Sequence, residues 1–186
     1  MGSYHYLVSS LPALSLEAPP PFSPEEFRFH CQGVLRDEDL EELDLLLAER
    51  AEEGRTEFSK AWAAGDAQIR NTAAKVRGAK LGVEAKPFLH SHRGYRVWLD
   101  REVSDALAKA NPLGREMGMD GARWTFVEEL ALEDASGLPA VLGFALRLVL
   151  AERWAAMQEE AGREQLEKLV SQLEENAAEC GAMDLV

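Results

Sequence analysis

The fold is decided by residues 56–80, which read TEFSKAWAAGDAQIRNTAAKVRGAK. Apolar side chains recur in this stretch at the three- and four-residue spacing that lines one face of an α-helix. Gly65 lowers helix stability by only about 1 kcal/mol relative to alanine, so it need not interrupt the pattern. The stretch therefore predicts one long helix from about Thr56 to Lys80. Its apolar face comprises Phe58, Ala61, Trp62, Ile69, Ala73 and Val76.

Two shorter helices are predicted before the long one. Residues 23–26 read SPEE, in which the serine can accept a backbone N–H, the proline fits the first helical position and the second glutamate completes a capping box. Gly33 is a natural end for that helix. Asp37 is expected to cap a second helix that runs to Gly54. Its apolar stripe is formed by Leu40, Leu43, Leu46 and Leu47.

Three further helices are predicted after the long one. The first covers residues 100–108, and the glycine-rich residues 113–121 are expected to form a loop. The second includes Arg123 and ends before Ser136-Gly137. The third covers residues 139–175 and would be about 55 Å long if straight, whereas a compact chain of this size has a radius of gyration of only about 16 Å. We therefore expect a break or bend near Gly162.

Signals for β-strands are few. The uncharged N-terminal stretch alternates over residues 4–8 as a short strand would, although a helical turn fits as well, and Pro19-Pro20-Pro21 then requires an extended connection. The predicted fold class is mainly α: a helical bundle of about six helices, with a short extended N-terminal segment and room for one short strand near residues 95–99. We expect a single helical domain over residues 1–176 and a frayed tail over residues 177–186.

Composition excludes several classes of function. The chain has 186 residues with a formal net charge of −13, so a nucleic-acid partner is not expected. No apolar run approaches the ~20 residues that span a bilayer, which predicts no direct membrane span. Pro12 interrupts the apolar N-terminal stretch, and no basic leader precedes it, so a secretory signal is not predicted either. The expected location is the cytoplasm.

The charge is unevenly distributed. Residues 54–101 carry ten basic and four acidic residues, whereas residues 17–53 carry three basic and twelve acidic ones. One interpretation is internal compensation, in which the basic segment packs among acidic neighbours. The other is that a basic face meets an acidic partner, where charge complementarity would set the association rate and the orientation.

Sequence patterns of catalytic and metal-binding proteins are missing. The chain has no P-loop, no dinucleotide-binding glycine pattern and no His-Glu-x-x-His pair. A di-metal helical bundle would need Glu-x-x-His on two helices, which the chain also lacks. We therefore predict no enzyme, no cofactor and no metal site. The least favoured alternative is a metal protein or enzyme that uses His30, Cys31, His90 and His92.

Two arginine–tryptophan pairs, Arg123-Trp124 and Arg153-Trp154, lie on predicted helices. Tryptophan commonly fills the core of a small helical protein. Tryptophan and arginine are also enriched at the energetic centres of protein interfaces. The sequence leaves both interpretations open.

The order of several motifs carries a family resemblance. Residues 4–16 read YHYLVSSLPALSL and residues 23–27 read SPEEF; IRNTAAKVRGAKLG, RWTFVEEL and LRLVLAERWAAMQEEAG follow at 69–82, 123–130 and 146–162. Over roughly residues 4–170 this order resembles an uncharacterised bacterial family encoded among V-type (A/V-type) ATPase genes. The resemblance implies a remote or reduced relative of the helical C (d-type) subunit of the central stalk.

The resemblance implies a non-catalytic structural or assembly subunit, located peripherally at the membrane through the ATPase, with other V-type ATPase subunits as its protein partners. A C subunit has three similar helical lobes, and this chain is long enough for about one. The alternative is a free-standing helical adaptor for protein–protein interaction. The motif positions, taken as interface candidates, are Tyr6, Leu11, Pro12, Arg70, Asn71, Arg77, Arg123, Trp124, Arg153 and Trp154.

Overall fold

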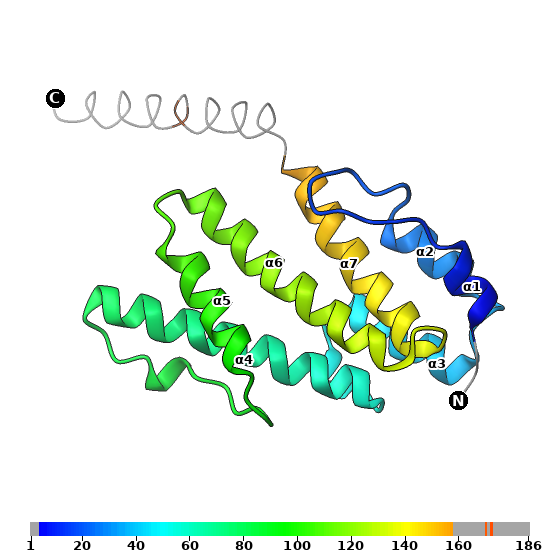
Figure 1. The fold of residues 1–186 in the computed structure, drawn as a ribbon, viewed down its shortest axis with the longest axis horizontal. Helices are drawn as coiled ribbons and strands as arrows, with labels where there is room; N and C mark the ends of the chain where they lie inside the picture. Colours follow the sequence, from blue (N-terminus) through cyan, green and yellow to red (C-terminus); the bar gives the residue numbers. More distant parts are fainter. Residues whose placement is uncertain (1–3, 158–169, 171, 173–186) are drawn as a thin grey trace, which may run out of the picture.

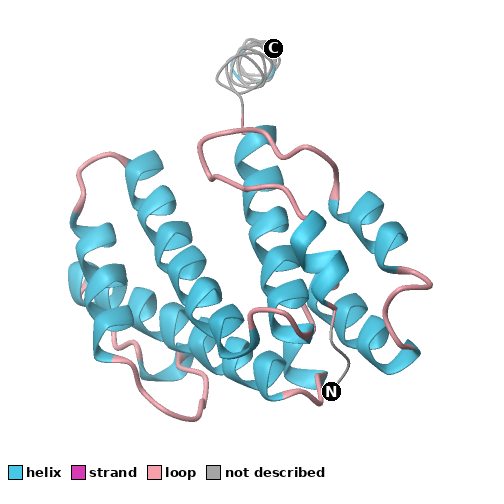
Figure 2. Cartoon of the chain, turned by 45° about the vertical axis from the view of Figure 1, so that its right-hand side comes forward, coloured by secondary structure: helices cyan, strands magenta, loops and turns pink. Residues whose placement is uncertain are grey.

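The computed structural model describes residues 4–157, 170 and 172. In this part of the chain every regular element is a helix, and Figure 2 shows helices joined by loops without a strand. The prediction of a mainly α bundle of about six helices is confirmed. None of these helices combines the length and apolar character needed to cross a bilayer. The α-helices are α1 (His5–Ser10), α2 (Pro24–Cys31), α3 (Asp37–Leu47), α4 (Glu57–Leu81), α5 (Val97–Ala108), α6 (Pro112–Ala131) and α7 (Leu138–Ala156).

The helices pack as two groups that share α7. On one side α4, α5 and α6 lie against one another, and α6 also packs along α7 (Figure 1). On the other side α7 contacts α1, α2 and α3. The middle of α7 is therefore covered all round, and residues 141–146 are all buried. A stretch of helix that is apolar all round forms the centre of a core rather than its surface.

The long helix α4 forms as predicted. The Thr56 hydroxyl accepts a hydrogen bond from the Ser59 backbone N–H at 3.1 Å, and Gly82 ends the helix in the left-handed conformation at φ 66°. A Cβ built on Gly65 would lie 2.0 Å from an atom of the Phe126 ring. This glycine is thus required for the close contact between α4 and α6.

The short helices α2 and α3 agree with the sequence in part. The capping box is confirmed: the Glu26 N–H donates to Ser23 Oγ at 3.1 Å and the Ser23 N–H donates to Glu26 Oε2 at 2.9 Å. Asp37 begins α3, but the N-cap residue is Arg36. The expectation that this helix reaches Gly54 is wrong, because α3 ends at Leu47 and a short 3-10 turn precedes the glycine.

The possible N-terminal strand is instead helical, as α1. Leu7, Val8 and Leu11 pack against the core, whereas Tyr6 is 90% exposed. Contacts at this spacing fit a helical face and not the alternate residues of a strand. Residues 11–23, between α1 and α2, form an irregular connection with a turn at residues 16–17.

Two further expectations are wrong. Residues 95–99 form no strand, because α5 begins at Val97. Residues 113–121 form no loop, because α6 begins at Pro112 and continues through the three glycines. A Cβ on Gly118 would lie 2.6 Å from that of Ala106, so this glycine serves close packing of α5 on α6 rather than a turn.

Helix α7 begins near Pro139 as predicted and ends at Ala156. The expected bend near Gly162 and the tail over residues 177–186 lie outside the described residues. The same holds for the predicted domain boundary at residue 176.

Candidate functional site

Asp120 on α6 is fully buried, and its carboxylate accepts hydrogen bonds from three side chains on two helices. Arg123 Nη1 donates to Oδ1 at 2.8 Å from the same helix. Arg153 Nη1 and Trp154 Nε1, both from α7, donate to Oδ2 at 3.0 Å. Both oxygens are thus held by donors, which is the arrangement that allows a carboxylate to be buried in charged form.

The network continues to α4 through Arg123, whose Nε lies 3.0 Å from Asp66 Oδ1. Burial disfavours the charged form of Arg123, but the carboxylates of Asp66 and Asp120 outweigh that effect and raise its pKa. The guanidinium therefore stays charged and joins the two helices. We call the residues Asp66, Asp120, Arg123, Arg153 and Trp154 the Asp120 cluster.

Two more interface candidates lie at the edge of this cluster. Arg70 pairs with Asp66 at 3.0 Å, as the four-residue spacing suggested. Arg77 lies 3.6 Å from Glu116, which also lies 3.6 Å from Arg153. Five of the ten candidates, namely Arg70, Arg77, Arg123, Arg153 and Trp154, thus join one network across α4, α6 and α7.

The Asp120 cluster is suited to holding helices in register. Its central carboxylate has no exposed surface from which to reach a substrate. Removal of one partner from such a buried ionic network leaves an uncompensated charge, which costs several kcal/mol. Within the described residues, the Asp120 cluster links α4, α6 and α7 through hydrogen bonds and ion pairs.

Trp124 belongs to a different group. Its Nε1 donates to Glu128 Oε1 at 3.0 Å, and the Arg147 guanidinium lies over its ring, 5.6 Å from the centroid. Both Arg153 and Trp154 therefore belong to the Asp120 cluster. Of the other pair, Arg123 belongs to the cluster and Trp124 does not.

Asn71 anchors the connection between α4 and α5. Its side-chain amide exchanges two hydrogen bonds of 2.7 Å with the backbone N–H and C=O of His90. Gln68, one turn earlier, does the same with the backbone of Arg96 at 2.7 and 2.9 Å. Gln68 is not among the predicted interface candidates; a second amide side chain three residues before Asn71 is the signal that could have identified it.

The segment held at His90 and Arg96 exposes both basic and apolar side chains to solvent. We call residues 82–96 the basic loop. Phe88 is 63% exposed and Tyr95 is 59% exposed. Lys86 and Arg93 are also exposed, and neither forms an ion pair within the described part of the chain. Internal compensation thus applies to Arg70, Arg77 and Arg96 but not to these two cations.

The three N-terminal candidates lie in other positions. Leu11 packs against the core, Pro12 is half-buried, and Tyr6 projects from α1. None of them contributes a side chain to the Asp120 cluster.

The histidine and cysteine set does not converge. His30 packs edge-on against Phe22, and burial raises the pKa of the Cys31 thiol to about 12. His90 is exposed in the basic loop. In the same loop His92 Nδ1 is buried, with no hydrogen-bond partner among the residues that the structure describes. Among the residues described, no group of three histidine, cysteine or acidic side chains is placed to hold a metal ion.

Comparison with known proteins gives one similarity. Residues 97–177 match the model of a family described as "Protein of unknown function (DUF2764)". The match begins with α5 and includes α6 and α7, so it contains Asp120 and both arginine–tryptophan pairs. No curated protein and no solved structure matches the chain. The expected resemblance to a family without assigned function is thus confirmed over these residues only.

Proposed function

We propose that this protein is a non-catalytic structural or assembly subunit that acts by binding another protein. The observation that carries the proposal is the basic loop, which presents exposed aromatic rings beside cations that lack an acidic partner among the described residues. Aromatic side chains supply contact area at an interface, and charges at its edge set orientation and association rate.

The anchoring of the loop supports this function. The side-chain amides of Asn71 and Gln68 hold the backbone at His90 and Arg96, with distances of 2.7–2.9 Å. A loop held in this way loses less conformational freedom when a partner binds, so more of the contact energy contributes to affinity. The partner surface that fits it is acidic, with apolar positions for Phe88 and Tyr95.

We assign the partner to a V-type ATPase on the strength of the motif resemblance. In that assignment the protein is a C-like stalk component of about one helical lobe, located in the cytoplasm and peripheral to the membrane through the complex. The alternative is a free-standing adaptor that uses the same loop for a partner outside the ATPase. Both proposed functions use the basic loop as the binding surface, and they differ only in which protein binds there.

The test is affinity purification of the full chain from its native host, followed by mass spectrometry. The loop variant Lys86→Glu/Arg93→Glu is compared with the control variant Lys60→Glu/Arg101→Glu, which has the same change of charge at exposed positions outside the loop. We expect the wild type and the control to recover ATPase stalk subunits and the loop variant to lose them.

Two results would count against this proposal. Recovery of another protein in place of ATPase subunits by the wild type would favour the adaptor. Equal recovery of stalk subunits by both double variants would show that the basic loop is not the binding surface.

A further inference from the structure

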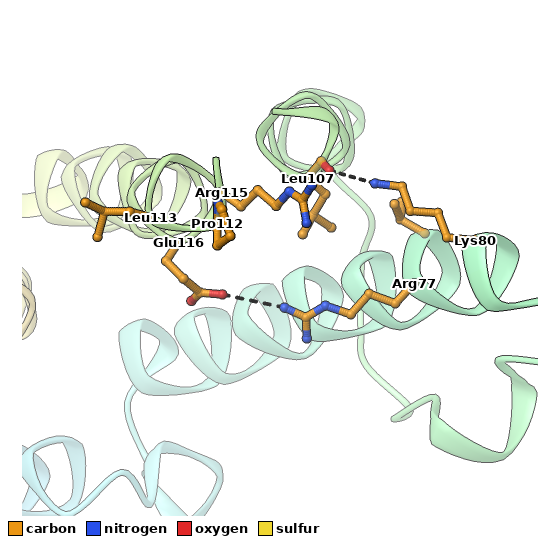
Figure 3. Close-up of a pocket in the computed structure, with 8 residues that line it drawn as sticks. Arg77, Lys80, Leu107, Pro112, Leu113, Arg115 and Glu116 are labelled. Carbon is orange, nitrogen blue, oxygen red and sulfur yellow. Dashed lines mark hydrogen bonds and ion pairs between the residues drawn. The ribbon is translucent and has the colours of Figure 1, made fainter. Parts of the chain in front are cut away.

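A second surface lies on the other side of α4, where α4, α5 and α6 enclose a groove of about 350 Å³ (Figure 3). We call it the α4–α6 groove. Its apolar part is formed by side chains of all three helices, and cations project around it. The lining residues are Val76, Arg77, Lys80, Leu107, Pro112, Leu113, Arg115 and Glu116.

The groove carries excess positive charge. Lys80 Nζ donates to the Leu107 carbonyl at 2.8 Å, and Arg115 Nε donates to the Lys109 carbonyl at 2.6 Å. Neither cation has a carboxylate within ion-pairing distance in the described part of the chain. The one acid in the lining, Glu116, is already shared by Arg77 and Arg153. An occupant that suits this groove is therefore both apolar and acidic.

The sequence after α7 has this character. Residues 158–186 contain eight acidic and two basic residues. Leu166, Leu169, Val170 and Leu173 stand at positions i, i+3, i+4 and i+7, the spacing of an amphipathic helix that lays one face into an apolar groove. Val170 is 46% exposed, so its side chain is available for such a contact.

The connection is also long enough. Arg153, in the last turn of α7, lies 3.6 Å from Glu116 in the groove lining, so α7 ends beside the groove. The nine residues from Met157 to Leu166 can span up to about 30 Å. A tethered segment has a high effective concentration at a site within its reach, which favours it over a free ligand of the same sequence.

We propose that residues 166–173 bind the α4–α6 groove of the same chain as an amphipathic helix. The leucines would cover Val76 and Leu113. The acids within and beside the segment, Glu164, Glu167, Glu174 and Glu175, would meet Lys80 and Arg115. The family match over residues 97–177 includes both α5 and α6 of the groove and this segment. The proposal is independent of the basic loop and of any ATPase partner.

The test uses the full chain with a nitroxide attached at Ser171→Cys in a Cys180→Ser background. Cys31 is buried, with a thiol pKa raised to about 12, so it is protected from the labelling reagent. In nuclear magnetic resonance spectra of the labelled protein, we expect the amide signals of Val76 and Leu113 to be lost. The signal of Val8, which lies on α1, should be retained.

Two variants separate docking from a general effect. Lys80→Glu/Arg115→Glu reverses the charge of the two groove cations that have no carboxylate partner among the described residues. Leu169→Asp/Leu173→Asp removes the apolar face of the segment without changing the described bundle. Each should restore the lost signals, whereas Lys60→Glu/Arg101→Glu should not.

Two results would overturn the proposal. Groove signals that remain in the labelled protein would show that the segment does not bind there. A mixture of nitroxide-labelled protein without isotope enrichment and isotope-enriched protein without a nitroxide tests for binding between copies. Loss of the groove signals of the isotope-enriched protein in this mixture would show that a second copy fills the groove.

Discussion

The Asp120 cluster and the basic loop use the same kinds of side chain in opposite ways. In the cluster, Asp120 is fully buried and Arg123 is paired on two sides. In the basic loop, Lys86 and Arg93 are exposed beside exposed aromatic rings, and neither has an ion-pair partner among the described residues. A paired, buried network is costly to break, because the remaining charges lose their partners inside the fold. Exposed groups without a partner can instead interact with another molecule. Stability and binding should therefore be separable by mutation.

The largest effect is expected at Asp120. Asp120→Ala leaves Arg123 without its 2.8 Å partner inside the bundle and removes the acceptor of Trp154. We expect the free energy of unfolding, measured by urea denaturation, to fall by about 3–5 kcal/mol. Asp105→Ala, which removes only an exposed pair with Arg101, should stay within about 0.5 kcal/mol of the wild type. A small loss at Asp120 would mean that the cluster does not hold the helices together.

A smaller effect is expected at the contact between α4 and α6. Gly65→Ala places a methyl group against the Phe126 ring, and we expect a loss of about 1–3 kcal/mol in the same measurement. Gly121 is the matched control, because it lies in α6 and no atom of the described residues is within 4 Å of the added Cβ. Gly121→Ala should stabilise the protein by about 0.5–1 kcal/mol. Equal effects of the two changes would contradict the close contact.

Glu42 is a second buried carboxylate, outside the Asp120 cluster, and its pKa makes stability depend on pH. Burial opposes its ionisation, but hydrogen bonds from the Ser59 hydroxyl, the Arg55 N–H and Thr56 together lower its pKa below the usual 4.5. A lowered pKa in the folded state adds stability that is present above pH 4.5 and is lost as the pH falls through the folded value.

Glu42→Gln should accordingly lower the free energy of unfolding at pH 7 by about 1–2 kcal/mol. The difference in free energy of unfolding between the variant and the wild type should become smaller when urea denaturation is repeated at lower pH. A difference in free energy of unfolding that stays constant from pH 7 to pH 3 would show that the ionisation of Glu42 contributes nothing to the stability of the fold.

The smallest effect on stability is expected in the basic loop. Lys86→Glu/Arg93→Glu changes two exposed cations without an ion-pair partner in the described residues, so the free energy of unfolding should stay within about 0.5 kcal/mol of the wild type. A larger loss in urea denaturation would place these cations in the folding network and remove the contrast with Asp120.

Much of the fold is readable from local sequence signals. The capping box at Ser23 and the long apolar face after Thr56 predict α2 and α4 because caps and helical periodicity act within a few residues. The loop expected over residues 113–121 is wrong because Gly118 is needed for close packing on Ala106, and that neighbour lies on another helix. Local glycine content does not distinguish a turn from a tight helix contact.

The candidate site is predictable only in part, for the same reason. The Arg123-Trp124 and Arg153-Trp154 pairs are visible in the sequence, but Asp120 is one of two acids in a glycine-rich stretch and nothing local distinguishes it from Glu116. Its partner Arg153 is 33 positions away, and Asp66 is 57 positions from Arg123. Only the packing of α4, α6 and α7 brings these groups together, so no local pattern marks the centre of the network.

The most direct test of the central claim measures folding and partner recovery on the same loop variant. With Lys86→Glu/Arg93→Glu, we predict a free energy of unfolding like that of the wild type together with loss of the partner protein from affinity purification. A variant that is equally stable and still recovers the partner in full would contradict it.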